Sequence, residues 1–195
     1  MRKMWNDADT KKKNMIMTIG IILFEIILFC VATIVVTPFY ETDDENTMAA
    51  ISMGIFGERN YRLVFMHSIL GRIMVFLTEL FPIVNWYSIL QWSFLFCSFT
   101  VILSILVKNT SFLRAVLVII LLGATFNFYS FYSLQFTRTA ATIALAGVIL
   151  LTDTLEHSEK KKMRKLIFGA LLLVFGSMYR FEGYGMVLCM AFFWV

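Results

Sequence analysis

The sequence predicts an all-α fold: a polytopic bundle of transmembrane helices whose first outer loop carries amphipathic helices lying in the membrane interface. Hydrophobic residues make up 59% of the 195 residues and the mean hydropathy is +0.79, whereas a soluble domain is only about half apolar. Long apolar runs recur along the chain, and charged residues cluster between them. Such clusters are typical of topology signals, so we expect membrane lipids and no nucleic acid as partners.

The first apolar run covers residues 15–36 and follows a polar, basic segment at residues 1–13. Its length of about 22 residues is enough to cross a hydrocarbon core of ~30 Å. Five Lys and Arg residues precede it, which predicts a multi-pass protein of the cell membrane with a cytoplasmic N-terminus. The run contains Glu25. An acid at this depth costs roughly 2.5–3.5 kcal/mol, so we expect it to face protein and to have a partner.

Further apolar runs occur at residues 86–107, 112–128, 139–151, 166–179 and 186–195. The last run is too short to span a membrane, and no polar residue follows it. We therefore expect residues 1–195 to form a single transmembrane domain that is the N-terminal part of a longer protein.

The run at residues 62–81 is ambiguous, because its length allows a span and its pattern is amphipathic. Arg62, Arg72 and Glu79 recur at roughly helical spacing, and apolar residues fill the other side. If this run does not cross, twelve of the seventeen Lys and Arg residues lie in the cytoplasm; if it crosses, the basic cluster at residues 160–165 lies outside. The positive-inside rule favours the first arrangement. Residues 37–85 are therefore predicted to form an exoplasmic loop.

Four of the thirteen acidic residues fall within residues 41–45, directly after the first apolar run. Thr42 and Glu45 have the spacing of a capping box, and acids suit the positive end of a helix dipole. The same carboxylates, held at the headgroup level, can act as a general base or bind a divalent metal. Structural and catalytic roles both stay open here. The helix that follows has an apolar face that we expect to lie along the bilayer, formed by Met48, Ile51 and Ile55.

A first apolar helix, an outer acidic pair at a helix start and amphipathic helices before the second span resemble the GT-C superfamily of membrane glycosyltransferases. Its members include the catalytic subunits of oligosaccharyltransferases, the protein O-mannosyltransferases and the aminoarabinose transferases. The local match is closest to the last group, through Asp44-Glu45-x-x-Met48-Ala49-x-Ile51-Ser52. A second stretch, Leu80-Phe81-Pro82 with Trp86-Tyr87, is similar to bacterial glucosyltransferases that modify O-antigen. The resemblance covers the N-terminal portion of such proteins.

This resemblance implies transfer of a sugar from a polyprenyl-phosphate-linked donor to a cell-envelope acceptor at the outer membrane face. Asp44 would be the catalytic base that activates the acceptor, or a divalent-metal ligand as in the metal-dependent members. Asp43 and Glu45 are the next candidates for this work. The second outer loop, at residues 129–138, has no acid, so the second metal-binding motif of the oligosaccharyltransferases is absent. We therefore expect a mechanism without a metal or another cofactor.

Basic residues on the outer side fit a lipid-phosphate substrate. Arg138 and Arg180 lie at helix ends on the same side as Asp44, and arginine binds phosphate oxygens with two parallel donors. Arg72 and His67, on the amphipathic run, are further substrate-binding candidates. Each arginine can instead extend to lipid headgroups.

Two functions of other classes stay open. A transporter or flippase would place Glu25 and the outer acids on the path of a cation or substrate. The interrupted helices and internal repeats typical of transporters are not visible in the sequence. A non-catalytic membrane subunit is the remaining alternative.

Overall fold

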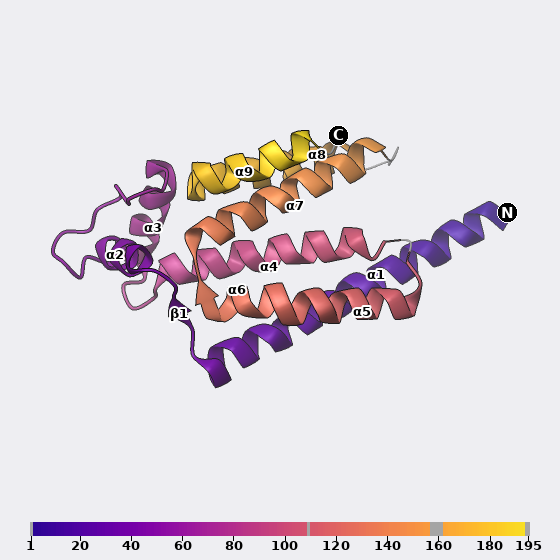
Figure 1. The fold of residues 1–195 in the computed structure, drawn as a ribbon, viewed down its shortest axis with the longest axis horizontal. Coiled ribbons are helices and arrows are strands. Elements are labelled where there is room, and N and C mark those ends of the chain that lie inside the picture. Colours follow the sequence, from indigo (N-terminus) through magenta and orange to yellow (C-terminus); the bar gives the residue numbers. More distant parts are fainter. Residues whose placement is uncertain (1, 109, 157–161, 194–195) are drawn as a thin grey trace.

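The computed structural model describes residues 2–108, 110–156 and 162–193, with side chains from residue 12 onwards. This part of the chain is mostly helical, and its long helices lie roughly lengthwise beside one another (Figure 1). Within it, four helices are long and apolar enough to cross a membrane by length and composition: Lys12–Val36, Trp86–Leu106, Phe112–Tyr132 and Phe136–Glu156. The all-α class expected from the sequence is therefore confirmed at this level.

Most of the helices follow one another with short connections, and the longest connection among the described residues, 54–67, joins α2 to α3. Helix α1 (Arg2–Cys30) continues into the π-helix η1 (Val31–Val36), and α5 (Phe112–Leu122) continues through the π-helix η2 (Gly123–Asn127) into α6 (Phe128–Tyr132). The remaining helices are α2 (Asp43–Met53), α3 (Ser68–Leu80), α4 (Trp86–Leu106), α7 (Phe136–Glu156), α8 (Lys162–Tyr179) and α9 (Phe181–Phe192). The two prolines of the chain, Pro38 and Pro82, lie between helices, where a missing backbone N–H and a fixed φ break no helical turn.

Two helices differ from the sequence prediction. The run expected at residues 166–179 belongs to α8, which begins at Lys162 and carries Arg164 and Lys165 in its first turn, so it is not among the four apolar helices. Helix α3 begins at Ser68, well after residue 62, because the chain turns at Phe65 with a φ of 68°. Its 13 residues span about 20 Å, less than the ~30 Å of a hydrocarbon core.

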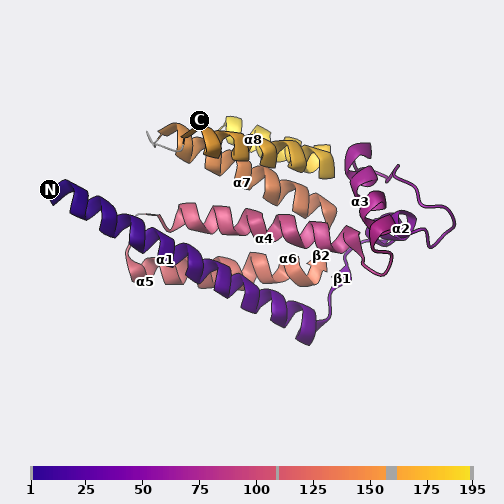
Figure 2. The ribbon, with the colours of Figure 1, turned by 180° about the vertical axis from the view of Figure 1, so that it is seen from behind.

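Helices α2 and α3 gather at one end of the molecule, away from the N-terminus, in both views (Figures 1 and 2). A two-stranded parallel bridge, which the sequence does not predict, attaches this segment to the bundle. Strand β1 (Phe39–Tyr40) pairs with β2 (Ser133–Leu134), and the Glu41 N–H donates to the Leu134 carbonyl oxygen at 3.0 Å. The bridge therefore places the start of α2 beside the start of α7.

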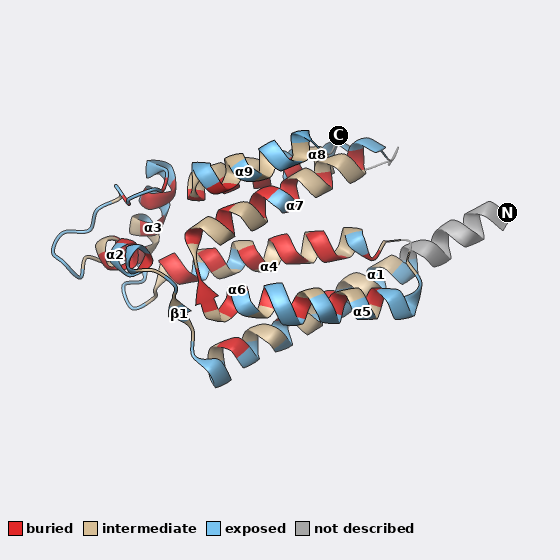
Figure 3. Cartoon of the chain, viewed as in Figure 1, coloured by how far each residue is buried: buried red, intermediate tan, exposed pale blue. Residues whose placement is uncertain are grey.

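Helix α7 forms the centre of the bundle and packs against α4, α8 and α9. Buried residues run along α7 and α4, whereas α5 and α9 are largely exposed (Figure 3). The buried face of α7 consists mostly of small and aliphatic residues: Phe136, Thr139, Ala140, Ile143, Ala144, Ala146, Gly147, Leu150 and Thr154. On the outer helices large apolar side chains point away from the protein, with Ile34 78% and Leu113 69% exposed. Such a surface matches a lipid environment.

The apolar face of α2 is oriented differently from the prediction. Met48 is fully buried and Ala49 nearly so, whereas Ile55 is 66% exposed. Met48 lies in the same apolar cluster as Leu70, Met74 and Tyr87, so this face of α2 packs onto α3 and α4. The expectation that Met48, Ile51 and Ile55 together lie along the bilayer is therefore wrong, because the end of the bundle offers a larger apolar surface to cover.

Candidate functional site

The acidic segment starts α2, as the sequence predicts. Thr42 is the N-cap residue in extended conformation, and Glu45 completes a capping box with it. One carboxylate oxygen of Glu45 accepts a hydrogen bond from the Thr42 backbone N–H at 3.0 Å and another from the Thr42 hydroxyl. The capping box is therefore confirmed. It fixes the angle at which the chain enters α2.

Glu45 also contacts α7. Its second carboxylate oxygen accepts a hydrogen bond at 2.9 Å from the backbone N–H of Phe136, the first residue of α7. A helix N-terminus leaves such N–H groups without intrahelical partners, and a carboxylate there is favoured by the helix dipole. Glu45 is fully buried with both oxygens occupied. Its contacts are those of an anchor between α2 and α7 rather than of a group that meets substrate.

Asp43 and Asp44 occupy the opposite environment. Both are exposed in the first turn of α2, and within the described part of the chain neither side chain makes a hydrogen bond or an ion pair. Only the main-chain oxygen of Asp43 is engaged, by the Thr47 hydroxyl at 2.9 Å. Two adjacent carboxylates are thus held on a rigid helix start and remain open to a ligand.

Arg138 is the third residue of α7 and is held by three groups. It forms an ion pair with Glu41, donates to the Ser133 carbonyl oxygen at 2.8 Å, and lies 4.2 Å from the ring centroid of Tyr129. The Ser133 hydroxyl donates to the same Glu41 carboxylate at 2.9 Å. This pairing of the acidic segment with the second loop was not foreseen, because Glu41 and Arg138 are far apart in sequence.

Arg180 is the N-cap residue of α9 and reaches the neighbouring start of α7. Its Nη1 donates to the Thr137 hydroxyl at 2.6 Å and its Nε to Glu182 at 2.5 Å. The guanidinium carbon lies 4.9 Å and 4.7 Å from the ring centroids of Phe65 and Phe136. Arg138 therefore belongs to the first turn of α7, which Glu45 caps, and Arg180 contacts the same turn through Thr137 and Phe136.

His67 and Arg72 have other surroundings. His67 caps α3, since its Nδ1 accepts a hydrogen bond from the Ile69 backbone N–H at 3.3 Å. The backbone N–H of His67 donates to the Met178 carbonyl oxygen at 2.8 Å. The Arg72 guanidinium lies 4.7 Å from the Tyr61 ring centroid. Hydrogen bonds from Arg62 and then Arg72 lower the pKa of the Tyr61 hydroxyl below its ordinary value. No contact among the described residues joins His67 or Arg72 to Asp44, Arg138 or Arg180.

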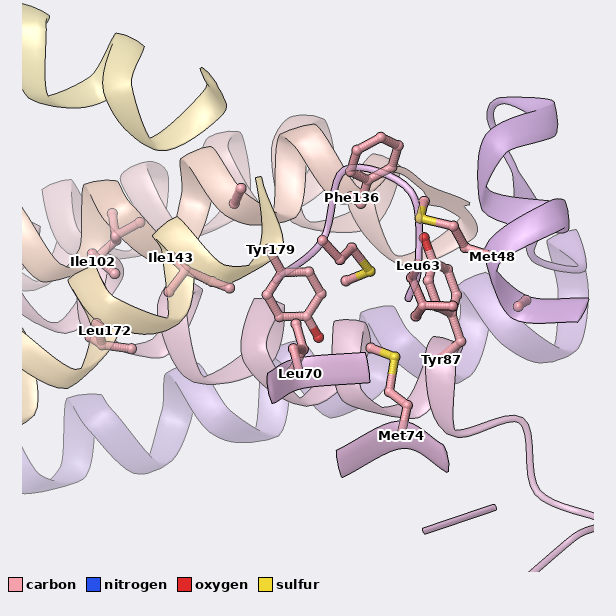
Figure 4. Packing of buried hydrophobic residues seen from close by; sticks show 14 of the residues in the cluster. Met48, Leu63, Leu70, Met74, Tyr87, Ile102, Phe136, Ile143, Leu172 and Tyr179 are labelled. Carbon is pink, nitrogen blue, oxygen red and sulfur yellow. The ribbon is translucent and has the colours of Figure 1, made fainter. Parts of the chain in front are cut away.

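A polar group that the sequence did not predict joins β1 to the start of α4. Tyr40, Asn85 and Ser88 form a hydrogen-bonded group, with the Tyr40 hydroxyl 2.7 Å from both Asn85 Nδ2 and Ser88 Oγ. Burial raises the pKa of that hydroxyl. Deeper, Tyr87 and Tyr179 are buried in the apolar cluster (Figure 4), and the Tyr179 hydroxyl has no hydrogen-bond partner in the described part of the chain. Tyr87 lies near the start of one apolar run and Tyr179 at the end of another, so nothing in the sequence indicates that they share a cluster.

Glu25 has the partners that its depth requires. It is fully buried, and its two oxygens accept hydrogen bonds from the Thr100 hydroxyl at 2.6 Å and from Asn127 Nδ2 at 3.2 Å. Thr100 belongs to α4 and Asn127 to η2, so the acid joins three helical segments. The expectation of a partner is confirmed, and both partners are neutral donors.

The acidic segment offers few ligands for a metal. In the described part of the chain, no three His, Cys, Asp or Glu side chains converge as a metal site requires.

Comparison of the chain with protein-family models, with curated protein sequences and with solved structures finds no match.

Proposed function

We propose that this protein is a membrane glycosyltransferase that transfers a sugar from a polyprenyl-phosphate-linked donor to a cell-envelope acceptor. The observation that carries the proposal is the contrast between two adjacent acids. Glu45 is buried and fixes α2 to α7, whereas Asp44 is exposed and has no partner within the described residues. A rigidly mounted, open carboxylate is what a general base requires.

The arrangement of the helices supports an outer location for this site. Successive long helices run in alternating directions, so residues 37–85, the α6–α7 connection and the α8–α9 turn gather at one end (Figures 1 and 2). Basic residues gather at the other end, with the N-terminus: Lys12, Lys13, Lys108, Arg114, Lys162, Arg164 and Lys165. Applied to this arrangement, the positive-inside rule puts the N-terminus in the cytoplasm and residues 37–85 outside.

In the proposed reaction Asp44 takes the proton from the acceptor hydroxyl or amine as that group attacks the anomeric carbon of the sugar. The new glycosidic bond forms as the bond between the anomeric carbon and the phosphate oxygen breaks, with inversion at that carbon. The electron pair of the broken bond leaves with the polyprenyl phosphate, and the proton stays on Asp44. Asp43, on the neighbouring position, is the reserve candidate for the same role.

Arg138 and Arg180 are proposed to stabilise the departing phosphate. Each already contacts one carboxylate, Glu41 or Glu182. An arginine has five N–H donors, however, and the protein contacts described above use only some of them. The remaining donors can bind phosphate oxygens, where charge develops as the bond breaks. His67 and Arg72 would then act at the margin of the site, toward the acceptor or the lipid headgroups.

The decisive experiment compares Asp44→Asn with Asp43→Asn in membranes that contain the protein, supplied with tritium-labelled glycosyl polyprenyl phosphates. Loss of a general base lowers a rate by about 10²- to 10⁴-fold, so we expect that loss in Asp44→Asn. The neighbouring exposed acid, changed in the same way, controls for the loss of one charge and should retain most of the rate.

Unchanged transfer in Asp44→Asn would show that the base is assigned to the wrong residue. The transporter alternative gives a different result in the same preparation. Proteoliposomes would then accumulate a solute or flip the labelled lipid without forming any glycosylated product.

A further inference from the structure

A cavity lies at the end of the bundle opposite to Asp44. Its volume is about 530 Å³, and it is lined by residues of α1, α4, α7 and α8. Along α4 its lining extends from Thr100 to Lys108, a depth of about 12 Å at the rise of an α-helix. That size is within the range of small-molecule sites, about 300–1,000 Å³. Nothing in the proposed transfer reaction uses this cavity.

The lining changes character along its depth. The inner part is mostly apolar, with Met17, Val101, Ile105, Leu150 and Phe168 beside the hydroxyls of Thr18 and Thr100. The outer part contains Lys108, Arg164 and Lys165, with Asp153 as the one carboxylate among the described lining residues. Lys108 Nζ contacts both oxygens of Asp153 at 3.1 Å. Counted over the described lining residues, three cations accompany one carboxylate, so at neutral pH this part of the mouth has an excess of positive charge next to a mostly apolar interior.

One buried polar atom also points to a ligand. The Ser104 side chain lines the cavity, and its hydroxyl oxygen is buried with no hydrogen-bond partner in the described part of the chain. A buried hydroxyl left unpaired costs about 1–3 kcal/mol, so such groups normally bind water or a ligand. Ser104 lies one helical turn inward from Lys108, where an ester oxygen behind a phosphate would reach it.

We propose that this cavity binds the phosphate of an anionic phospholipid at Lys108, Arg164 and Lys165, with the acyl chains against the apolar interior. A phosphodiester carries one negative charge and accepts several hydrogen bonds, which complements the cationic mouth. A cation is disfavoured there by the excess of positive charge. A free phosphate shares the headgroup chemistry and would leave the apolar part unfilled.

The test measures the affinity of the full chain in detergent micelles for three probes: short-chain phosphatidylglycerol, short-chain phosphatidylcholine and inorganic phosphate. Phosphatidylglycerol is expected to bind at least about tenfold more tightly than the other two, which corresponds to roughly 1.4 kcal/mol. Added salt should weaken its binding, because the headgroup contacts are ionic.

Two double variants with the same change in net charge test the location. Arg164→Gln with Lys165→Gln removes two cations from the mouth, and we expect phosphatidylglycerol to bind about tenfold more weakly. Arg114→Gln with Lys162→Gln removes two cations from the same end but from outside the cavity, and should leave the affinity unchanged. Equal losses in both double variants, or equal affinity for phosphatidylglycerol and phosphatidylcholine, would overturn the proposal.

A third variant separates the lipid from a free anion. Thr18 lines the cavity, and Thr18→Phe puts a ring into it without changing any charge. Binding of phosphatidylglycerol should fall several-fold while any binding of inorganic phosphate is retained. Loss of phosphate binding in step with lipid binding, or phosphate binding as tight as that of the lipid, would assign the site to a free anion and contradict the lipid.

Discussion

Neighbouring residues in the acidic segment have opposite surroundings. Glu45 is fully buried and accepts hydrogen bonds from Thr42 and Phe136, whereas Asp44 faces outward. The difference arises because one helical position turns the side chain by about 100°, from the bundle to the outside. A role in structure and a role in chemistry can therefore occur side by side in the same turn of α2.

This contrast predicts different effects on stability. Glu45→Gln keeps the size of the side chain, but its NH₂ group cannot accept the hydrogen bonds that the carboxylate accepts from backbone and hydroxyl donors. The free energy of unfolding should therefore fall by about 1–3 kcal/mol. Asp44→Asn should change it by less than ~0.5 kcal/mol, because the exposed side chain has no partner in the described residues. Unfolding in detergent by denaturant measures both, and equal losses would contradict the anchor role.

At the scale of elements, α7 and α8 approach closely because glycines face each other. A Cβ on Gly147 would lie 3.0 Å from the Gly169 carbonyl oxygen, and one on Gly169 would lie 2.8 Å from Leu151 Cγ. Gly176 is similarly close to Ala140, with 3.1 Å to its carbonyl oxygen. Small residues at helix contacts allow backbones to approach and increase van der Waals contact, which drives helix association in membranes.

Filling this contact should separate the helices. Gly169→Leu is expected to destabilise the protein by about 1–3 kcal/mol, because the α7–α8 contact has no room for a side chain. Gly20→Leu on α1 is the matched control, since a Cβ there would meet nothing within 4 Å. Its effect should be neutral or slightly stabilising. Thermal unfolding in detergent compares the two, and a lower melting temperature for Gly20→Leu would contradict this account.

At the scale of the molecule, alternating helix directions divide the chain into two chemically different ends. One end collects the acids of α2 with Arg138 and Arg180, and the other collects the N-terminus and the basic cavity. The contacts of Glu45 and Glu41 with the α6–α7 region attach α2 to the first of these ends. The acidic segment and the mouth of the cavity are therefore separated by about the length of α4, roughly 30 Å for 21 residues.

This division predicts opposite accessibility of the two ends. In a background in which Cys30, Cys97 and Cys189 are replaced by alanine, we expect Asn46→Cys to react with an impermeant maleimide in intact cells. Ser111→Cys should react only after permeabilisation, because the α4–α5 connection lies at the end with the N-terminus. Both positions are exposed in the structure, so burial does not explain a difference. Labelling of Ser111→Cys in intact cells would overturn the proposed orientation.

Local patterns in the sequence were sufficient for the helical class, the apolar runs, the capping box of Thr42 and Glu45, and the need of Glu25 for a partner. Each of these depends on residues within a few helical turns, where spacing and polarity determine the outcome. The start of α3 was not predicted, because the chain turns at Phe65 with a positive φ and a phenylalanine is no sequence signal for such a turn.

Tertiary structure alone decided which of the acids is buried and which arginine is paired. Glu45 meets Phe136, Glu41 meets Arg138, and β1 meets β2 across more than ninety residues of chain. The cavity likewise combines residues of α1, α4, α7 and α8. Such contacts depend on how the helices pack, which is set by the whole buried surface and not by any local pattern. The sequence therefore determined the helices and their polarity, and packing determined which side chains are left open to a ligand.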